Sequence, residues 1–349
     1  MNLTYTAEFI LSIPVTEPER LFPASFDGIK NEFLSLIKEW HPDHNNSPQA
    51  SEVVQHLLDL KVSANKKLTG GLWQVPGQVE ILTMKGKKFN FSFRSKHDIE
   101  IGTMYVGNKH VLFVIQKQHK TLYENGLKHM RDFVFGSTEM RKEMEKYLPK
   151  IKWTEEGLDY YYVLLTKSSD VVLLRDLVKH YNGKIPPKHV GWIISSVLNI
   201  GCYLSWAQTA HQAINIDTVF VSPKQHSGLL LGGWWYAMKE GESLRGRSLP
   251  AQSAALMSTA QLRARTAAIQ LDQDLIRALG RELLGDASGT MLRASNDLPQ
   301  EIINWAKGTS TKGALDSYKQ WKAVLVKSFG PPKFVKMQIT PDQIYTGET

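Results

Sequence analysis

The chain has 349 residues, a formal net charge of +8 at pH 7 and a single cysteine, Cys202. One cysteine excludes an internal disulfide, disfavours a structural zinc site and indicates a reducing, cytoplasmic compartment. No apolar run approaches the ~20 residues of a membrane span, and the start of the chain does not resemble a secretory signal. With domains of roughly 100–200 residues, the length fits two or three domains.

Two amphipathic helices are expected near the start of the chain. From residue 26 to residue 40 apolar side chains recur at steps of three and four, which places them on one face of a helix. Pro42 ends this helix, and Ser47-Pro48 opens the second with a cap residue and a proline. The first stripe is Phe26, Ile29, Phe33, Leu36, Ile37 and Trp40, and the second is Val53, Leu57, Leu60, Ala64 and Leu68.

The junction of these helices reads His41-Pro42-Asp43. Two antiparallel helices joined through this tripeptide resemble the J domain of DnaJ-type co-chaperones, whose tripeptide stimulates ATP hydrolysis by a DnaK-type chaperone. The resemblance implies a chaperone-binding site at His41, Pro42 and Asp43, with Lys30 and Lys38 beside it. The alternative is a helical hairpin in which Asp43 only caps a turn.

The first helix departs from the J-domain pattern on its surface. Leu34, Ser35 and Glu39 stand at positions that are frequently basic in the family, so that Lys30 and Lys38 remain. A reduced positive patch weakens electrostatic steering of an acidic partner. The sequence therefore predicts a weak, salt-sensitive interaction with the chaperone.

A linker is expected at residues 70–78, where turn-forming residues interrupt the helical periodicity. Beyond it the pattern changes to strands with one helix among them. That order is typical of the small lobe of a protein kinase. The expected elements are strands at 89–93, 99–106, 111–115 and 160–165, and a helix at 121–133.

The rest of the chain is expected to be mainly helical, with a short helix at 171–180 and a long one opened by Pro186-Pro187. Residues 211–221 then have the spacing of a kinase catalytic loop, and residues 229–237 stand where kinases have the strand before Asp-Phe-Gly. The chain here resembles the protein-kinase fold. The resemblance implies that His211 and Asp274 hold the scaffold together.

The same resemblance removes the chemistry of a kinase. Ala213 stands at the position of the catalytic base, and Thr218 and Gly233 stand at the positions of the two metal ligands. Because phosphoryl transfer depends on positioning and on offsetting phosphate charge, little mechanism is left. We expect no enzymatic activity, no cofactor and no metal. The alternative is an unrelated mixed α/β domain that shares a few apolar segments.

Two functional alternatives stay open. A divergent kinase-fold enzyme or nucleotide binder would use Lys117, Glu124 and Asp217, with Lys117 lying three residues after the residue aligned with the kinase strand lysine, Val114. A nucleic-acid-associated protein would use a basic strand surface. That surface comprises Lys85, Lys87, Lys88, Arg94 and Lys96, and a separate set, Arg245, Arg247, Arg263 and Arg265, suits an acidic partner.

We therefore expect an α+β protein with an amino-terminal helical J-like domain and a two-lobed kinase-like domain. The expected limits are residues 1–69, a linker at 70–78, the kinase-like domain at 79–335 and a tail at 336–349. The first domain would engage a DnaK-type chaperone ATPase and the second would bind an unidentified client, in the cytoplasm and without a membrane. A phage or bacterial source would fit such a fusion.

Overall fold

The computed structural model describes residues 5–15, 17–70, 73, 77–292, 298–310 and 313–345. Parts of the expected linker (71–72 and 74–76) and of the expected tail (346–349) lie outside the described residues. Residues 1–82 and 87–93 form one compact unit, and residues 83–86 and 94–348 form another. The expected domain limits stay predictions.

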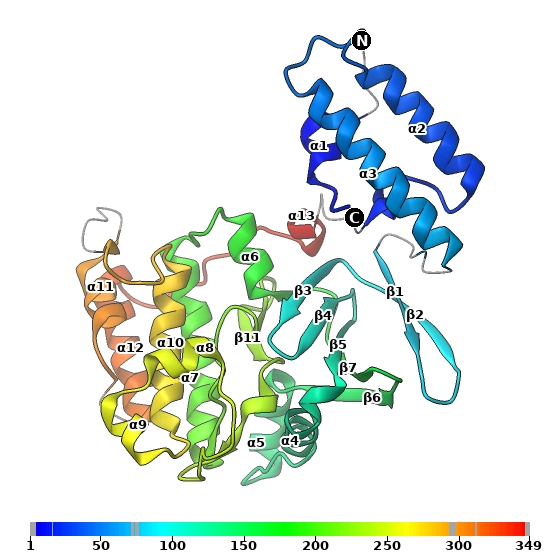
Figure 1. The fold of residues 1–349 in the computed structure, drawn as a ribbon. Helices are drawn as coiled ribbons and strands as arrows, with labels where there is room; N and C mark the ends of the chain where they lie inside the picture. Colours follow the sequence, from blue (N-terminus) through cyan, green and yellow to red (C-terminus); the bar gives the residue numbers. More distant parts are fainter. Residues whose placement is uncertain are drawn as a thin grey trace. The chain divides into compact units, whose positions relative to one another are not determined.

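The first unit contains the two expected helices, α2 (Phe26–Trp40) and α3 (Ala50–Thr69), which run side by side (Figure 1). A short helix, α1 (Ala7–Ser12), packs against α3. The unit also includes a hairpin of β1 (Gln78–Leu82) and β2 (Lys88–Ser92). The helical core consists of Ala7, Ile10, Ile13, Leu21, Phe22, Ile29, Phe33, Leu36, Trp40, Val53, Leu57, Leu60 and Ala64.

Two details of the helical hairpin differ from the expectation. Phe26 is 56% exposed, because it occupies the first helical position and its neighbour Ser25 caps the helix by accepting a hydrogen bond from the Gly28 amide. The second helix starts at Ala50, two residues after Ser47-Pro48. Ser47 instead forms a turn, in which its carbonyl oxygen accepts from the Ala50 amide.

The second unit has a small lobe, residues 94–166, built on one antiparallel sheet of five strands in the order β3-β4-β5-β7-β6. The helix α4 (Lys120–Arg131) lies beside it, and Tyr123 of α4 stacks on Tyr161 at 4.2 Å between ring centroids. A second helix, α5 (Thr138–Met144), was not expected. The strands are β3 (Ser95–Ile99), β4 (Gly102–Val106), β5 (His110–Gln116), β6 (Lys150–Glu156) and β7 (Tyr160–Thr166).

The single strand expected at 99–106 is wrong, because the chain turns back between β3 and β4. Ile99 pairs with Gly102 across this turn. Gly102 has φ +154°, and a Cβ there would collide with the carbonyl oxygen of Val114. A residue with a Cβ at this position could not bring β4 so close to β5. Glycine therefore occupies the first position of β4.

The large lobe, residues 171–345, is mainly helical. As expected, its longest helix, α7, begins at Pro187. The short helix expected at 171–180 begins later, at Leu174, because β8 occupies the preceding residues. The elements are β8 (Val172–Leu173), α6 (Leu174–His180), α7 (Pro187–Trp206), β9 (Thr209–Ala210), β10 (Val219–Ser222), β11 (Ser227–Leu230), β12 (Met238–Lys239), α8 (Ala251–Leu256), α9 (Thr259–Ala264), α10 (Ile269–Leu283), α11 (Gln300–Lys307) and α12 (Ala314–Phe329).

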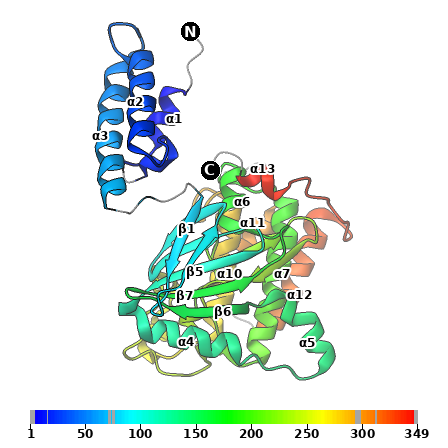
Figure 2. The ribbon, with the colours of Figure 1, turned by 90° about the vertical axis from the view of Figure 1, so that its right-hand side faces the viewer.

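The chain after α12 returns to the start of the large lobe. Its last helix, α13 (Pro341–Tyr345), lies beside α6 in both views (Figures 1 and 2). Met337, Ile344 and Tyr345 are buried, so residues 337–345 of the expected tail are part of the folded lobe. The α+β class and the two lobes of the second unit are thus confirmed. Within the described part of the chain, every helix is too short or too polar to cross a membrane.

Candidate functional site

The tripeptide His41-Pro42-Asp43 lies directly after α2. The His41 amide still donates to the carbonyl oxygen of Ile37 at 2.8 Å, so this residue closes the last turn of the helix. The Asp43 amide donates to Nδ1 of His41 at 3.2 Å, and the Asp43 carboxylate lies 3.5 Å from the same nitrogen. The Asp43 side chain is 78% exposed. The carboxylate is therefore available to a basic partner.

The loop after the tripeptide is held by hydrogen bonds within itself. The amides of His44 and Asn45 both donate to the carbonyl oxygen of His41, each at 2.9 Å. The side chain of Asn45 donates to the carbonyl oxygen of Glu39 at 3.0 Å and accepts from the Ser47 amide at 2.9 Å. Asn45 thus joins the end of α2 to the start of the turn before α3, which fixes the direction in which Asp43 points.

Lys30 and Lys38 are exposed on α2, and Leu34 lies between them at steps of four residues. Residues four apart on a helix are neighbours on its surface. Leu34 is 54% exposed, so an apolar side chain interrupts the basic row. The structure places Lys30 and Lys38 on one face of α2, with the uncharged side chain of Leu34 between them.

The loop that begins at His211 is held by a buried carboxylate. The amides of His211 and Gln212 donate to the two oxygens of Asp272 at 2.7 and 2.6 Å. Asp272 belongs to α10, and both it and His211 have no exposed surface. The ring nitrogen Nε2 of His211 bonds the carbonyl oxygen of Gly232 at 3.0 Å, and since that oxygen only accepts, Nε2 carries the hydrogen.

The expectation that Asp274 braces this loop is wrong. Asp274 is half-buried, and its carboxylate accepts from the Ser310 amide at 3.2 Å, away from His211. Side chains two positions apart on a helix point about 200° apart around its axis, so Asp272 and Asp274 lie on opposite faces of α10. The sequence offered two aspartates two positions apart, and only the packing of α10 decides which one turns toward the loop.

Burial sets the protonation states of His211 and Asp272. It lowers the pKa of His211 to about 3, so the imidazole is neutral at physiological pH. Burial raises the pKa of Asp272 to about 7, while the two backbone amides that donate to it act in the opposite direction. A neutral, fully buried histidine has no access to a substrate, so the role of His211 is structural.

A pocket of about 250 Å³ lies between the small lobe and the loop that begins at His211. Its lining includes Ala213, Thr218 and Gly233, which the kinase resemblance in the sequence aligns with the base and the metal ligands. The described residues that line it include no lysine and no arginine. Its carboxylates are Asp98, Glu100 and Asp217, and aromatic rings come from Phe113, Trp235 and Tyr236.

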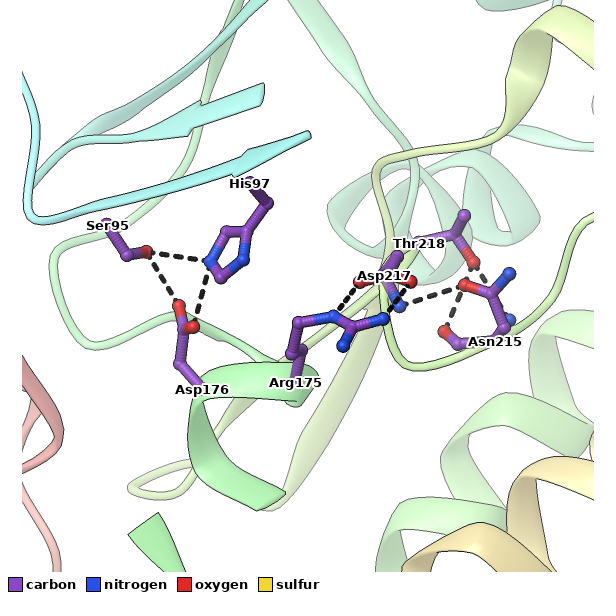
Figure 3. Close-up of polar contacts among 7 residues, drawn as sticks. All are labelled: Ser95, His97, Arg175, Asp176, Asn215, Asp217 and Thr218. Atoms are coloured by element: carbon purple, nitrogen blue, oxygen red, sulfur yellow. Dashed lines mark hydrogen bonds and ion pairs between the residues drawn. The ribbon is translucent and has the colours of Figure 1, made fainter. Parts of the chain in front are cut away.

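Each of the three carboxylates has a partner. The Asp98 carboxylate accepts from the Thr103 hydroxyl at 3.3 Å. The Arg175 guanidinium bonds both oxygens of Asp217, one of them at 2.5 Å (Figure 3). Glu100 accepts from the Tyr236 hydroxyl and from the Ala251 amide, each at 3.0 Å. Across the described residues, no set of three or more histidine, cysteine, aspartate or glutamate side chains is placed to hold a metal ion.

The structure does not bring Lys117, Glu124 and Asp217 together, and the expected nucleotide site is wrong in this respect. Lys117 lies past the end of β5, forms an ion pair with Glu156 and rests 4.5 Å above the ring of Tyr161. Glu124 pairs along its own helix with Lys120 at 3.7 Å. Of the three, only Asp217 lines the pocket, and the β5 side chain that reaches it is Phe113.

The basic strand surface is partly neutralised. Lys88 pairs with Glu80 at 3.1 Å, and Arg94 pairs with Asp342. Lys88 and Arg94 therefore already have acidic partners, which weakens the nucleic-acid alternative.

Sequence reasoning missed a polar cluster that joins the two lobes. Asp176 of α6 is 3% exposed and accepts from the Ser95 hydroxyl at 2.7 Å, and its other oxygen lies 2.9 Å from Nε2 of His97 (Figure 3). The Ser95 oxygen also contacts that same Nε2, at 3.2 Å. A nucleophilic triad needs serine and aspartate on opposite ring nitrogens, so this cluster is a brace.

No signal in the sequence pointed to this brace, because Ser95 and Asp176 are 81 residues apart. Tyr345 of α13 joins the same region, since its hydroxyl accepts from the Leu173 amide at 3.4 Å. Burial raises the pKa of Tyr345 well above its usual range, and Asp176 adds to the shift. The small lobe, α6 and the last helix therefore meet at one buried point.

The comparisons with known proteins give little further support. No family model and no curated protein matches the chain. Among solved structures, the chain is similar to the "Crystal structure of BubR1 kinase domain", with 13% sequence identity and a TM-score of 0.49. That match covers 72% of this chain and 84% of the other. A TM-score below 0.5 does not establish a common fold, so the kinase resemblance depends on the geometry described above.

Proposed function

We propose that the chain is a co-chaperone-type adaptor with two working parts. The first unit engages a DnaK-type chaperone ATPase through His41, Pro42 and Asp43, and the second is a non-catalytic kinase-like platform that binds a client protein. The observation that carries the proposal is Asp43, whose carboxylate is 78% exposed on a loop fixed by its own hydrogen bonds. A fixed, exposed acid between two antiparallel helices suits recognition of a basic groove.

The kinase-like reading of the second unit is supported by its internal scaffold. A sheet of five antiparallel strands with α4 beside it is followed by a helical lobe, in the order that the kinase resemblance implies. Between them a histidine-headed loop is held through its backbone by Asp272. These contacts serve the fold whatever the chemistry, so they can persist in a protein without activity.

The absence of catalysis is supported by the space and charge of the pocket. Gly233 has φ +79°, and a Cβ there would lie 2.7 Å from Cε1 of His211, so a carboxylate has no room at this position. Asp98, Glu100 and Asp217 would face the phosphates of a nucleotide without a lysine or arginine in the described lining. Phosphoryl transfer needs the opposite arrangement of charge.

Contacts between the lobes support a rigid platform. Kinases open and close around their nucleotide. Here Asp176 bonds Ser95 and His97 across the lobes, and Glu100 of the small lobe bonds Tyr236 of the large lobe. Breaking the buried bond between Ser95 and Asp176 on opening would leave polar groups unsatisfied at about 1–3 kcal/mol each. A fixed shape is an advantage for a binding surface and a handicap for turnover.

The first test is stimulation of a DnaK-type ATPase by the full chain. Wild type should raise the steady-state hydrolysis rate, and His41→Gln should abolish the effect without changing the melting temperature. His44→Gln is the matched control, because His44 lies three residues later in the same loop. Equal stimulation by wild type and His41→Gln would refute the chaperone role.

The second test is transfer of label from radioactive ATP with magnesium or manganese. We expect no phosphoprotein above background. Label transfer that disappears in Asp217→Asn would establish the enzyme alternative, since Asp217 is the carboxylate of the loop that lines the pocket.

A further inference from the structure

One surface of the large lobe carries an excess of positive charge that the fold does not use. Residues 241–268 follow β12 and contain α8 and α9. This segment has a single acidic residue, Glu242, and no phenylalanine, tryptophan or tyrosine. Its four arginines are all exposed: Arg245, Arg247, Arg263 and Arg265.

The backbone gathers these arginines although they lie in two stretches of the sequence. The Leu244 amide donates to the carbonyl oxygen of Arg265 at 2.8 Å, and Ser243 forms an antiparallel bridge with Thr266. The two stretches 241–247 and 263–267 therefore run next to each other. We name the exposed area formed by Arg245, Arg247, Arg263 and Arg265 the arginine surface.

The acidic groups nearby are occupied by the backbone. The Glu242 carboxylate accepts from the Lys239 amide at 3.1 Å, and the Glu240 carboxylate accepts from the Ile269 amide at 2.6 Å. In the described part of the chain, no ion pair joins any of the four arginines to a carboxylate. Their guanidinium groups are left to solvent or to a partner.

Arg265 holds a conformation that arginine adopts at a cost. It ends α9 with φ +49° and ψ +44°, the left-handed region in which glycine is the usual residue. A residue with a Cβ pays roughly 1–2 kcal/mol there. Arg265 is one of five described residues other than glycine that have a positive φ, and its side chain is exposed and charged.

We propose that the arginine surface binds an acidic, partly apolar peptide segment of the client protein. Guanidinium groups bind carboxylates through two parallel hydrogen bonds. Single-stranded nucleic acids need aromatic rings on which bases stack, and the segment has none, whereas Leu262 is 54% exposed beside Arg263. The inference rests on the proposed function, because it names the chemistry of the client that the kinase-like platform would hold.

The test is fluorescence anisotropy of a labelled peptide of alternating glutamate and leucine, titrated with the full chain at low salt. Wild type should bind, and the double variant Arg263→Glu, Arg265→Glu should weaken binding by about tenfold or more, as expected when charge pairs are reversed. Arg131→Glu, on the exposed end of α4, is the matched control and should bind like wild type. Added salt should weaken binding by wild type.

Arg265→Gly separates binding from folding. Glycine suits the left-handed position, so this variant should melt at the wild-type temperature or above while its peptide affinity falls. No peptide binding, equal binding by the double variant, or tighter binding of a single-stranded oligothymidine than of the peptide would each overturn the inference.

The two proposals fail in different ways. Arg265→Gly should still stimulate the chaperone ATPase in the absence of peptide, and His41→Gln should still bind the peptide. Loss of stimulation in both variants would contradict a separate arginine surface. Peptide binding by a chain that never stimulates the chaperone would refute the co-chaperone role and support the surface as a binding site in its own right.

Discussion

Two tripeptides headed by histidine occupy comparable places in the chain and have opposite environments. His41-Pro42-Asp43 follows α2 with the His41 side chain 44% exposed and the Asp43 side chain 78% exposed. His211-Gln212-Ala213 follows the long helix α7 and the short β9, and each of its residues is at most 1% exposed. The first therefore exposes its acid to solvent, and the second contains no acidic residue and serves the fold.

The difference distinguishes exposed residues, whose substitution should affect binding, from buried residues, whose substitution should affect stability. The side chains of His41 and Asp43 contact each other and solvent, so removing either should change binding with little effect on stability. His211 packs against Trp234 at 4.9 Å between ring centroids and bonds Gly232, so changing it should alter stability.

The largest expected effect belongs to Asp272→Ala. This change leaves the buried amides of His211 and Gln212 without an acceptor, at about 1–3 kcal/mol for each. We expect a loss of about 4 kcal/mol in the free energy of unfolding, measured by chemical denaturation. Asp274→Ala, two residues along the same helix, removes a half-buried carboxylate that accepts from the Ser310 amide and should cost about 1 kcal/mol. The reverse order would contradict the assignment of Asp272 as the brace.

Tyr345→Ala tests whether the last helix stabilises the large lobe. The side chain is 4% exposed and contacts the chain where α6 begins, so its removal should leave a cavity costing about 3 kcal/mol. Phe334→Ala is the matched control, since Phe334 is 71% exposed and only stacks on His226. Equal melting temperatures for wild type and Tyr345→Ala would show that residues 337–345 do not contribute to the folded lobe.

Much of the fold was predictable because its signals are local. Apolar periodicity and the proline at its first turn located α7, and the same periodicity located α2 and α3. The turn between β3 and β4 was missed. Gly102, the first residue of β4, lies close to Val114 of β5, a strand that comes later in the chain. Local pattern contains no information about such an approach.

The candidate sites divide in the same way. The tripeptide His41-Pro42-Asp43 was found from contiguous residues, and its Asp43 side chain is exposed, while its role as a binding site stays a prediction. The brace of Ser95, His97 and Asp176 was invisible, because its members meet only after the lobes pack. The sequence analysis assigned the brace to Asp274 instead of Asp272 for the same reason. Which face of α10 turns toward the loop is decided by how the helix packs.

The buried histidine also predicts a dependence of stability on pH. Burial holds the pKa of His211 at about 3, below the value of about 6.5 in the unfolded chain, so the unfolded state binds more protons between these values. Its contribution to stability is complete above pH 6.5 and is lost as the pH falls toward 3. Asp272 has the opposite sign, because its pKa is raised to about 7 and protonation favours the folded state.

Comparing the stability of wild type with that of His211→Gln at each pH isolates the contribution of His211. His211→Gln keeps the backbone amide that donates to Asp272, so the contribution of Asp272 should cancel. Between pH 7 and pH 5 wild type should lose about 2 kcal/mol relative to His211→Gln, measured by denaturant unfolding at each pH. A parallel pH profile for wild type and His211→Gln would contradict the burial of a neutral imidazole.

The smallest expected change in stability belongs to Leu34→Lys, and it tests the exposed side of the contrast directly. Leu34 is 54% exposed and lies between Lys30 and Lys38 on the surface of α2, so the substitution should alter the free energy of unfolding by less than about 0.5 kcal/mol. It completes a row of three lysines beside the tripeptide, which should raise stimulation of the chaperone ATPase several-fold at low salt, with the gain fading as salt is added. Leu34→Gln is the control, because it removes the leucine without adding charge. If Leu34→Gln stimulates as well as Leu34→Lys, contact area and not charge limits this interaction. If neither differs from wild type, α2 does not form part of the surface that the chaperone would contact.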